Sequence, residues 1–98
     1  MRPIWVYILR CSDGSYYTGS YRGEEIETRL SEHNLAVDPK AYTAKRRPVT
    51  LVWAETFINA DDAIAFERQV KGWSRKKKEA LIRNEWEALP VLSKRGKA

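Results

Sequence analysis

The sequence predicts a mixed α/β (α+β) fold in one small domain. Residues 4–10 and 16–21 read as the arms of a β-hairpin around a Ser-Asp-Gly turn. Residues from Glu24 to about Leu35, and again 59–71, carry apolar side chains at helical spacing. Between these helices, residues 49–57 are rich in β-branched and aromatic side chains, which favour a buried strand. The expected order is therefore hairpin, helix, loop, strand and helix, followed by one more helix.

Capping residues set the limits of the two later helices. Asn59 is the predicted N-cap of the second helix, because its side chain can accept hydrogen bonds from amides of the first turn. Gly72 ends that helix, and Ser74 caps a third helix that runs to about Arg83. Residues 36–48, which contain two prolines, read as a loop.

Length and composition limit the class of protein. The chain has 98 residues, of which 43% are hydrophobic, so we expect one domain over residues 1–90 and a flexible basic tail over 91–98. No apolar run is long enough to cross a membrane, and the N-terminal run leads into a turn rather than a signal-peptide cleavage site. Cys11 is the single cysteine and cannot form an internal disulfide, so we place the protein in the cytoplasm.

The charge distribution favours a polyanionic partner such as nucleic acid. Eighteen Lys and Arg exceed thirteen Asp and Glu, which gives a net charge of +5. The excess is concentrated in two runs: Lys45, Arg46 and Arg47, and Arg75, Lys76, Lys77 and Lys78. The second run lies at the start of the third helix, where a bound phosphate would relieve its repulsion by the helix dipole. A charged face screened by solvent explains both runs equally well.

The hairpin register decides where two tyrosines point. A two-residue turn of Asp13 and Gly14 would place Tyr7 and Tyr17 on opposite faces of the sheet. A three-residue loop with Gly14 in the left-handed conformation would pair Tyr7 with Gly19 and put both tyrosines on one face. Gly19 would then leave an open floor beside two hydroxyl groups. The sequence permits both registers.

The first predicted helix carries polar residues on the stripe that should be buried. Ile26, Arg29, Leu30 and His33 follow the i, i+3, i+4, i+7 pattern, and His33 is the only histidine of the chain. Charged groups are not buried without partners, which suggests a site. Alternatively, Arg29 extends from the edge of the stripe to solvent and His33 is a border residue.

The second predicted helix repeats the anomaly with a carboxylate. Glu67 interrupts the apolar stripe of Ala63, Phe66 and Val70. A carboxylate there needs an arginine, a metal ion or a raised pKa. A structural salt bridge, for instance with Arg29, is the alternative to a functional site.

In their order and spacing, these residues resemble the motifs of the GIY-YIG nuclease family. Val6-Tyr7 followed by Tyr17-Thr18-Gly19 resembles the paired motifs from which the family takes its name. Arg29 with His33 four residues later looks like the helix motif of the family, and Glu67 looks like its metal-binding glutamate. The resemblance selects the register that places both tyrosines and Gly19 at one site.

The resemblance covers roughly residues 4 to 89. Three further stretches are similar to the small stand-alone bacterial members: Tyr42-Thr43, Arg46-Arg47-Pro48 and residues 71–82. Trp5-Val6-Tyr7 replaces the first glycine of the family motif, and Asn84 is only an approximate match to a late asparagine.

The resemblance implies a three-stranded antiparallel sheet flanked by helices and metal-dependent hydrolysis of DNA. Glu67 would hold Mg²⁺ or Mn²⁺, and Arg29 would bind the phosphate oxygens. Tyr7 is our candidate general base, with Tyr17 positioning water or phosphate, although exchanged roles fit the sequence equally well. His33 would assist proton transfer or orient a tyrosine.

The resemblance also bears on partners. We assign nucleic-acid binding to Gly19 and to both basic runs, and we expect a monomer acting on DNA, with branched or damaged duplexes as candidate substrates in repair or recombination. A separate targeting protein is one way to supply specificity. Two other hypotheses stay open: a nucleic-acid-binding module without catalysis, and an interaction domain whose polar stripe residues form an internal salt-bridge network.

Overall fold

The computed structural model describes residues 2–85, which form three strands and three helices. The elements are β1 (Ile4–Arg10), β2 (Tyr16–Arg22), α1 (Ile26–Asn34), β3 (Thr50–Phe57), α2 (Ala60–Lys71) and α3 (Arg75–Ile82). Their order is the predicted one. The predicted tail, residues 91–98, lies outside the described residues, as does the end of the predicted domain.

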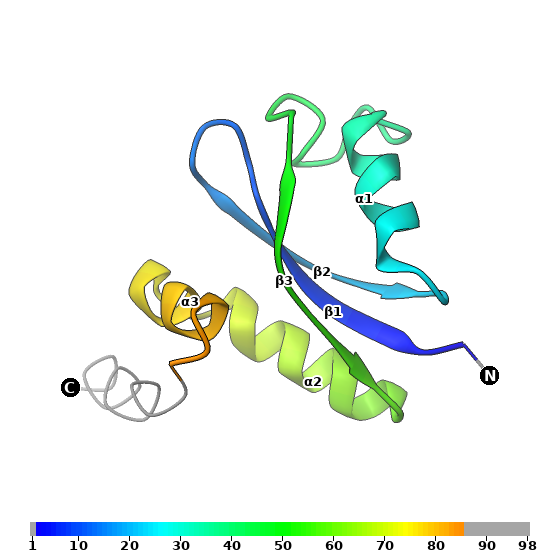
Figure 1. Cartoon of the computed structure of the whole chain (residues 1–98), viewed down its shortest axis with the longest axis vertical. Coiled ribbons are helices and arrows are strands. Elements are labelled where there is room, and N and C mark those ends of the chain that lie inside the picture. Colours follow the sequence, from blue (N-terminus) through cyan, green and yellow to red (C-terminus); the bar gives the residue numbers. More distant parts are fainter. Residues whose placement is uncertain (1, 86–98) are drawn as a thin grey trace.

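The three strands form one antiparallel sheet in the order β2-β1-β3, as the family resemblance implies. Helix α1 lies on one side of this sheet, and α2 and α3 lie on the other (Figure 1). The first strand of the chain is therefore the central strand and is covered on both faces.

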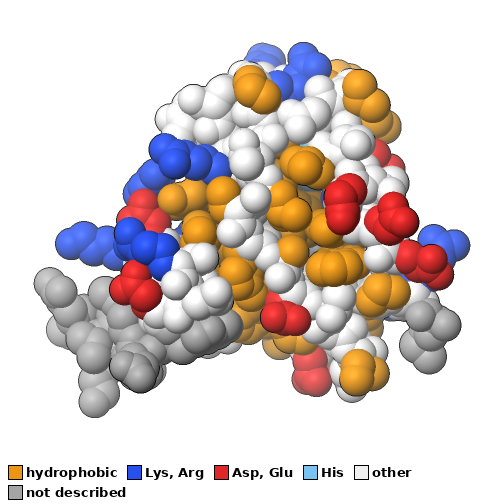
Figure 2. All heavy atoms as spheres, viewed as in Figure 1, with side chains coloured by type: hydrophobic (Ala, Val, Ile, Leu, Met, Phe, Trp, Pro, Cys, Tyr) orange, Lys and Arg blue, Asp and Glu red, His pale blue; other side chains and the backbone are white. Residues whose placement is uncertain are grey.

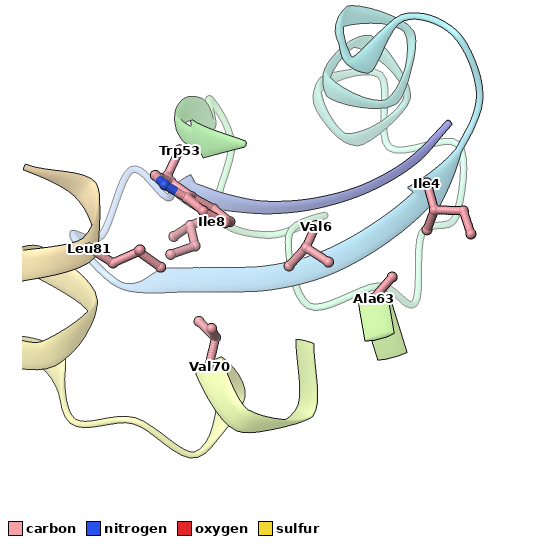
Figure 3. Packing of buried hydrophobic residues seen from close by; sticks show 7 residues of the cluster. All are labelled: Ile4, Val6, Ile8, Trp53, Ala63, Val70 and Leu81. Carbon is pink, nitrogen blue, oxygen red and sulfur yellow. The ribbon is translucent and has the colours of Figure 1, made fainter. Parts of the chain in front are cut away.

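One face of β1 builds the larger core, against α2 and α3 (Figure 3). Its buried members are Ile4, Val6, Ile8, Trp53, Ala63, Val70 and Leu81. Alternate residues of a strand point to opposite faces, so every second residue of β1 enters this core. Val70 and Leu81 approach the strand from the two helices, as the apolar stripe of the second predicted helix requires.

The opposite face of β1 builds a second core beneath α1. It contains Tyr7, Leu9 and Cys11 from the hairpin, with Ile26 from α1 and Val49 from the segment before β3. Tyr7 is thus placed on the α1 side by strand alternation alone.

The hairpin adopts the register that puts both tyrosines on one face. The amide of Gly14 donates to the carbonyl of Cys11 at 2.9 Å, and the amide of Cys11 donates to Ser15 at 2.8 Å. Gly14 has a φ of +84°, in the left-handed region that glycine adopts without strain. The three-residue loop therefore pairs Tyr7 with Gly19, and the alternative two-residue turn is excluded.

Both predicted N-caps are present, whereas the first helix starts later than expected. Asn59 accepts from the amides of the first turn of α2, and Ser74 accepts from the Lys77 amide at 3.2 Å. Helix α1 begins at Ile26 rather than Glu24, because Glu25 remains extended (φ −123°, ψ 118°) and provides no side-chain cap.

Candidate functional site

The centre of the site is the hydroxyl group of Tyr7, a residue that is 1% exposed. This oxygen lies 2.9 Å from Nε2 of His33 and accepts a hydrogen bond from Nε of Arg29 at 3.2 Å. The two polar residues on the α1 stripe therefore point inward and meet the tyrosine of β1 at a single atom. Their position on the stripe is explained by this contact.

His33 is held from its other ring nitrogen by a residue of the loop. Its Nδ1 lies 2.7 Å from Oγ1 of Thr43, and both side chains are buried. Thr43 is not among the site residues predicted from the sequence. The one sequence feature that pointed to a role for Thr43 is the Tyr42-Thr43 stretch, which resembles the family.

These contacts allow two proton arrangements. A guanidinium group can only donate, so the Tyr7 oxygen always accepts from Arg29. In the first arrangement Tyr7 donates its proton to Nε2 of His33, and Nδ1–H donates to Thr43. In the second, Thr43 donates to Nδ1 and Nε2–H donates to Tyr7, whose oxygen then accepts two hydrogen bonds. The second arrangement suits a phenolate.

Burial keeps this network uncharged apart from Arg29. Desolvation raises the pKa of Tyr7 to about 12, and the hydrogen bond and charge of Arg29 oppose the rise without cancelling it. Desolvation, with the charge of Arg29 second, lowers the pKa of His33. Arg29 favours the ionised form of Tyr7, but burial outweighs it. The phenol is therefore protonated at neutral pH.

Gly19 lies against the ring of Tyr7. A Cβ atom at this position would stand 2.5 Å from the Tyr7 hydroxyl oxygen and 2.7 Å from its Cζ. The interpretation of Gly19 as an open floor that contacts nucleic acid is wrong, because the tyrosine ring fills that space and Gly19 is itself buried. The glycine is required for close approach of Tyr7 to β2.

Tyr17 forms the outer wall of the site. Its ring centroid lies 6.4 Å from that of Tyr7 and 5.3 Å from the imidazole of His33, and it stacks on Tyr42 at 6.0 Å. An open pocket of about 250 Å³ adjoins these rings. Its polar lining comes from Tyr17, Arg29, Glu32, His33, Asp38, Tyr42 and Thr43.

Glu67 approaches from the α2 side of the sheet. Its carboxylate bonds Lys71 at 3.1 Å, and its side chain is 16% exposed. Arg29 pairs instead with Glu32 at 3.0 Å, so the alternative of an Arg29–Glu67 salt bridge is wrong. The negative charge of Glu67 also raises the pKa of Tyr7, as the smallest of the contributions.

The donor set around Glu67 fits a hard cation with few protein ligands. Within residues 2–85, no group of three or more His, Cys, Asp or Glu could hold a metal ion. Mg²⁺ commonly uses one or two carboxylates and completes its shell with water and substrate phosphate oxygens. The single carboxylate of Glu67, whose partner Lys71 lines a pocket, matches that requirement.

The first basic run, residues 45–47, is partly used within the protein. Arg46 lies over the Tyr42 ring at 3.8 Å and bonds Asp13 at 3.2 Å. Arg47 donates to the carbonyl groups of Ala44 and of Asn34. These contacts, together with that of the Ser12 amide to the Arg46 carbonyl, hold the loop against the hairpin turn.

The second basic run is split by the fold. Lys77, assigned with the rest of this run to nucleic-acid binding, is only 8% exposed, and its ammonium lies 4.2 Å from the Trp73 ring centroid. Arg75 lies over Tyr16 and pairs with Glu79, and Lys76 is exposed. On the face shown in Figure 2, Lys and Arg gather over the hairpin turn and around α3.

Asn84 lies just after α3 in the left-handed conformation, with a φ of 59°. Asparagine tolerates this region better than most residues, so helix termination accounts for it.

A family comparison identifies the domain. Residues 3–80 match the model of the GIY-YIG catalytic domain. The chain belongs to the GIY-YIG family. A GIY-YIG domain implies a nuclease-type function, and GIY-YIG nucleases act on DNA.

The relatives are small, single-domain GIY-YIG proteins. A UPF0213 protein of Halobacterium salinarum is 45% identical over 77 residues, which cover 79% of this chain and 96% of the relative. The solution structure of the UPF0213 protein BH0048 from Bacillus halodurans is 37% identical, with a TM-score of 0.53 and 83% of each chain covered. That of EF2693 from E. faecalis is 36% identical, with a TM-score of 0.59 and 86% coverage of each chain. Within residues 2–85, no helix has the length and apolar character to span a membrane.

Proposed function

We propose that this GIY-YIG protein is a metal-dependent endonuclease that hydrolyses DNA phosphodiester bonds. The observation that carries the proposal is the buried Tyr7 hydroxyl, held by Arg29 and His33. The proposal combines this proton acceptor with a phosphate-binding cation and the Glu67 carboxylate, which are the groups that hydrolysis of a phosphodiester requires.

Tyr7 is the general base in this proposal. It first transfers its proton to Nε2 of His33, and the resulting phenolate takes a proton from the attacking water while Arg29 and Nε2–H donate hydrogen bonds to it. The first proton arrangement, in which Nδ1–H donates to Thr43, leaves Nε2 free to receive the Tyr7 proton. Tyr17 lines the pocket, which supports a role for it in positioning water or phosphate.

Arg29 binds the non-bridging oxygens of the scissile phosphate. Its side chain is 35% exposed and lines the pocket, while Glu32 fixes its other end. Mg²⁺ or Mn²⁺ held by Glu67 would neutralise charge at phosphorus as a Lewis acid. Without this cation, the negative charge of Glu67 would repel the phosphate. Lys71, which bonds the Glu67 carboxylate, would offset part of that charge.

The proposal includes a location, an oligomeric state and a class of DNA substrate. We place the protein in the cytoplasm as a monomer that acts on branched or damaged DNA in repair or recombination. Exposed Lys45 and Lys76 are available for contacts with the phosphate backbone.

The test compares Glu67→Gln with Glu55→Gln, an exposed glutamate on β3, outside the site. Supercoiled plasmid and branched DNA are incubated with each protein in Mg²⁺ and in EDTA. We expect cleavage that requires Mg²⁺, is lost in Glu67→Gln and persists in Glu55→Gln.

Two outcomes would overturn the proposal. Equal cleavage by Glu67→Gln and wild type would remove Glu67 from the site. Salt-sensitive DNA binding without cleavage of any substrate would instead support a binding module.

A further inference from the structure

A second hollow lies along β2, which is an edge strand of the sheet. It is an open groove of about 340 Å³. Its lining consists of Tyr16, Tyr17, Thr18, Tyr42, Lys71 and Lys78. Because adjacent residues of β2 point to opposite faces, the groove connects the α1 side of the sheet with the side covered by α2 and α3.

Two polar groups that line this groove have no partner within residues 2–85. Lys78 is half-buried, and its side chain takes part in no hydrogen bond, ion pair or ring contact there. Thr18 is 3% exposed, and its hydroxyl group has no hydrogen-bond partner. By contrast, Arg75 on the same helix as Lys78 is paired with Glu79.

An unpaired, half-buried ammonium group carries a cost in free energy. Burial lowers the pKa of Lys78, which shows that its surroundings disfavour the charged form. An anion in the groove would offset that cost. Lys71 adds a second ammonium group in the same groove, bonded to Glu67 at 3.1 Å.

The groove is continuous with the proposed active site. Tyr17 lines both hollows and contacts the rings of Tyr7 and His33. Tyr17 therefore stands between the groove and the general base. Of the common anions, a phosphodiester strand is long enough to reach from one hollow into the other.

We infer that this groove binds one unpaired strand of nucleic acid, with Lys78 contacting a phosphate next to the scissile one. The inference rests on the proposed function and names its substrate as DNA with a locally single-stranded segment at the cut. Tyrosine walls combined with cationic groups are typical of sites for single strands. The walls are preorganised, since Arg46 covers the Tyr42 ring and Arg75 covers the Tyr16 ring.

The test measures binding of a fluorescent oligothymidylate of about eight nucleotides by anisotropy, in EDTA so that no cleavage occurs. Lys78→Gln is compared with Lys40→Gln, an exposed lysine outside both basic runs that does not line the groove. We expect Lys78→Gln to weaken binding about tenfold and to reduce the salt slope by about 0.7, the value for one phosphate contact on a single strand. Lys40→Gln should change affinity less than twofold, and duplex competitor should displace the oligonucleotide poorly.

Thermal unfolding separates binding from packing. Removal of an unpaired, half-buried charge should leave the melting temperature of Lys78→Gln unchanged or higher, while binding falls. A fall in both would assign Lys78 to packing and overturn the inference. Equal losses of binding in both lysine variants would show that binding depends on overall charge rather than on Lys78. That result would also overturn the inference.

The two proposals can fail separately. If binding is lost selectively in Lys78→Gln but the wild-type protein does not cleave, the groove inference stands and the endonuclease proposal fails. Metal-dependent cleavage together with normal oligonucleotide binding by Lys78→Gln would retain the endonuclease and remove the groove.

Discussion

Gly19→Ala tests the geometry of the site with a single added carbon. The new Cβ would lie 2.5 Å from the Tyr7 hydroxyl oxygen and 2.7 Å from Cζ, well inside van der Waals contact. The ring of Tyr7 is buried, so it cannot move without lengthening its hydrogen bonds to His33 and Arg29. Overpacking of this kind costs about 1–3 kcal/mol of unfolding free energy. Each kcal/mol lowers the melting temperature of a domain of this size by about 4–8 °C.

The effect on catalysis should be larger than the effect on folding. Displacement of a catalytic group by about 1 Å reduces rates about 100-fold, so single-turnover cleavage should fall by that factor. Oligonucleotide binding in EDTA should stay within about twofold, because the basic residues are untouched. Gly72→Ala is the matched control, since its Cβ would meet nothing closer than 3.6 Å and its φ is −84°. Wild-type stability and cleavage in Gly19→Ala would refute the close approach of Tyr7 to Gly19.

Three further predictions concern the hydrogen-bond network. Thr43→Val keeps the side-chain shape but leaves Nδ1 of His33 without its partner. We expect cleavage to fall about tenfold to 100-fold and ¹⁵N NMR to show an altered imidazole tautomer. Thr43→Ser should restore both the cleavage rate and the tautomer. The pKa of Tyr7 is raised from 10.0 to about 12, so the stability it contributes is present below pH 10 and is lost, by about 2–3 kcal/mol, as the pH rises through 12. Tyr7→Phe should abolish cleavage and flatten this part of the stability–pH curve in denaturant titrations; an unchanged curve would contradict the burial of the phenol. Arg29→Lys keeps the charge but loses the planar fork, and cleavage should fall about 100-fold while the melting temperature changes little.

The fold was predictable where local chemistry decides it. Asn59 and Ser74 cap their helices as expected, since their side chains act on amides two or three residues away. The start of α1 was misplaced because Glu24 and Glu25 favour a helix in composition, yet neither supplies a cap. The hairpin register could not be chosen from the turn sequence alone, because both loop lengths suit Asp13-Gly14.

The candidate site was predictable because its polar residues interrupt apolar helix stripes. Arg29, His33 and Glu67 each interrupt an apolar stripe, and the contacts of all three explain the interruption. Thr43 gave no such signal, since it lies in a loop where a threonine is ordinary. Its contact with His33 depends on how the chain folds back over ten residues. The burial of Lys77 was likewise hidden, because a lysine in a charged run reads as exposed.

The placement of Tyr7 links the stability of the fold to the chemistry of the site. Its neighbours Val6 and Ile8 are fully buried in the larger core, and burial of such side chains stabilises the folded state by about 1.5–3 kcal/mol each. The Tyr7 hydroxyl is therefore fixed by the central strand. The hydroxyl contacts Arg29 and His33 of α1, and His33 in turn contacts Thr43 of the following loop. Two hydrogen bonds between Asn34 and Val49 join the ends of that loop, so the position of His33 depends on contacts outside the site.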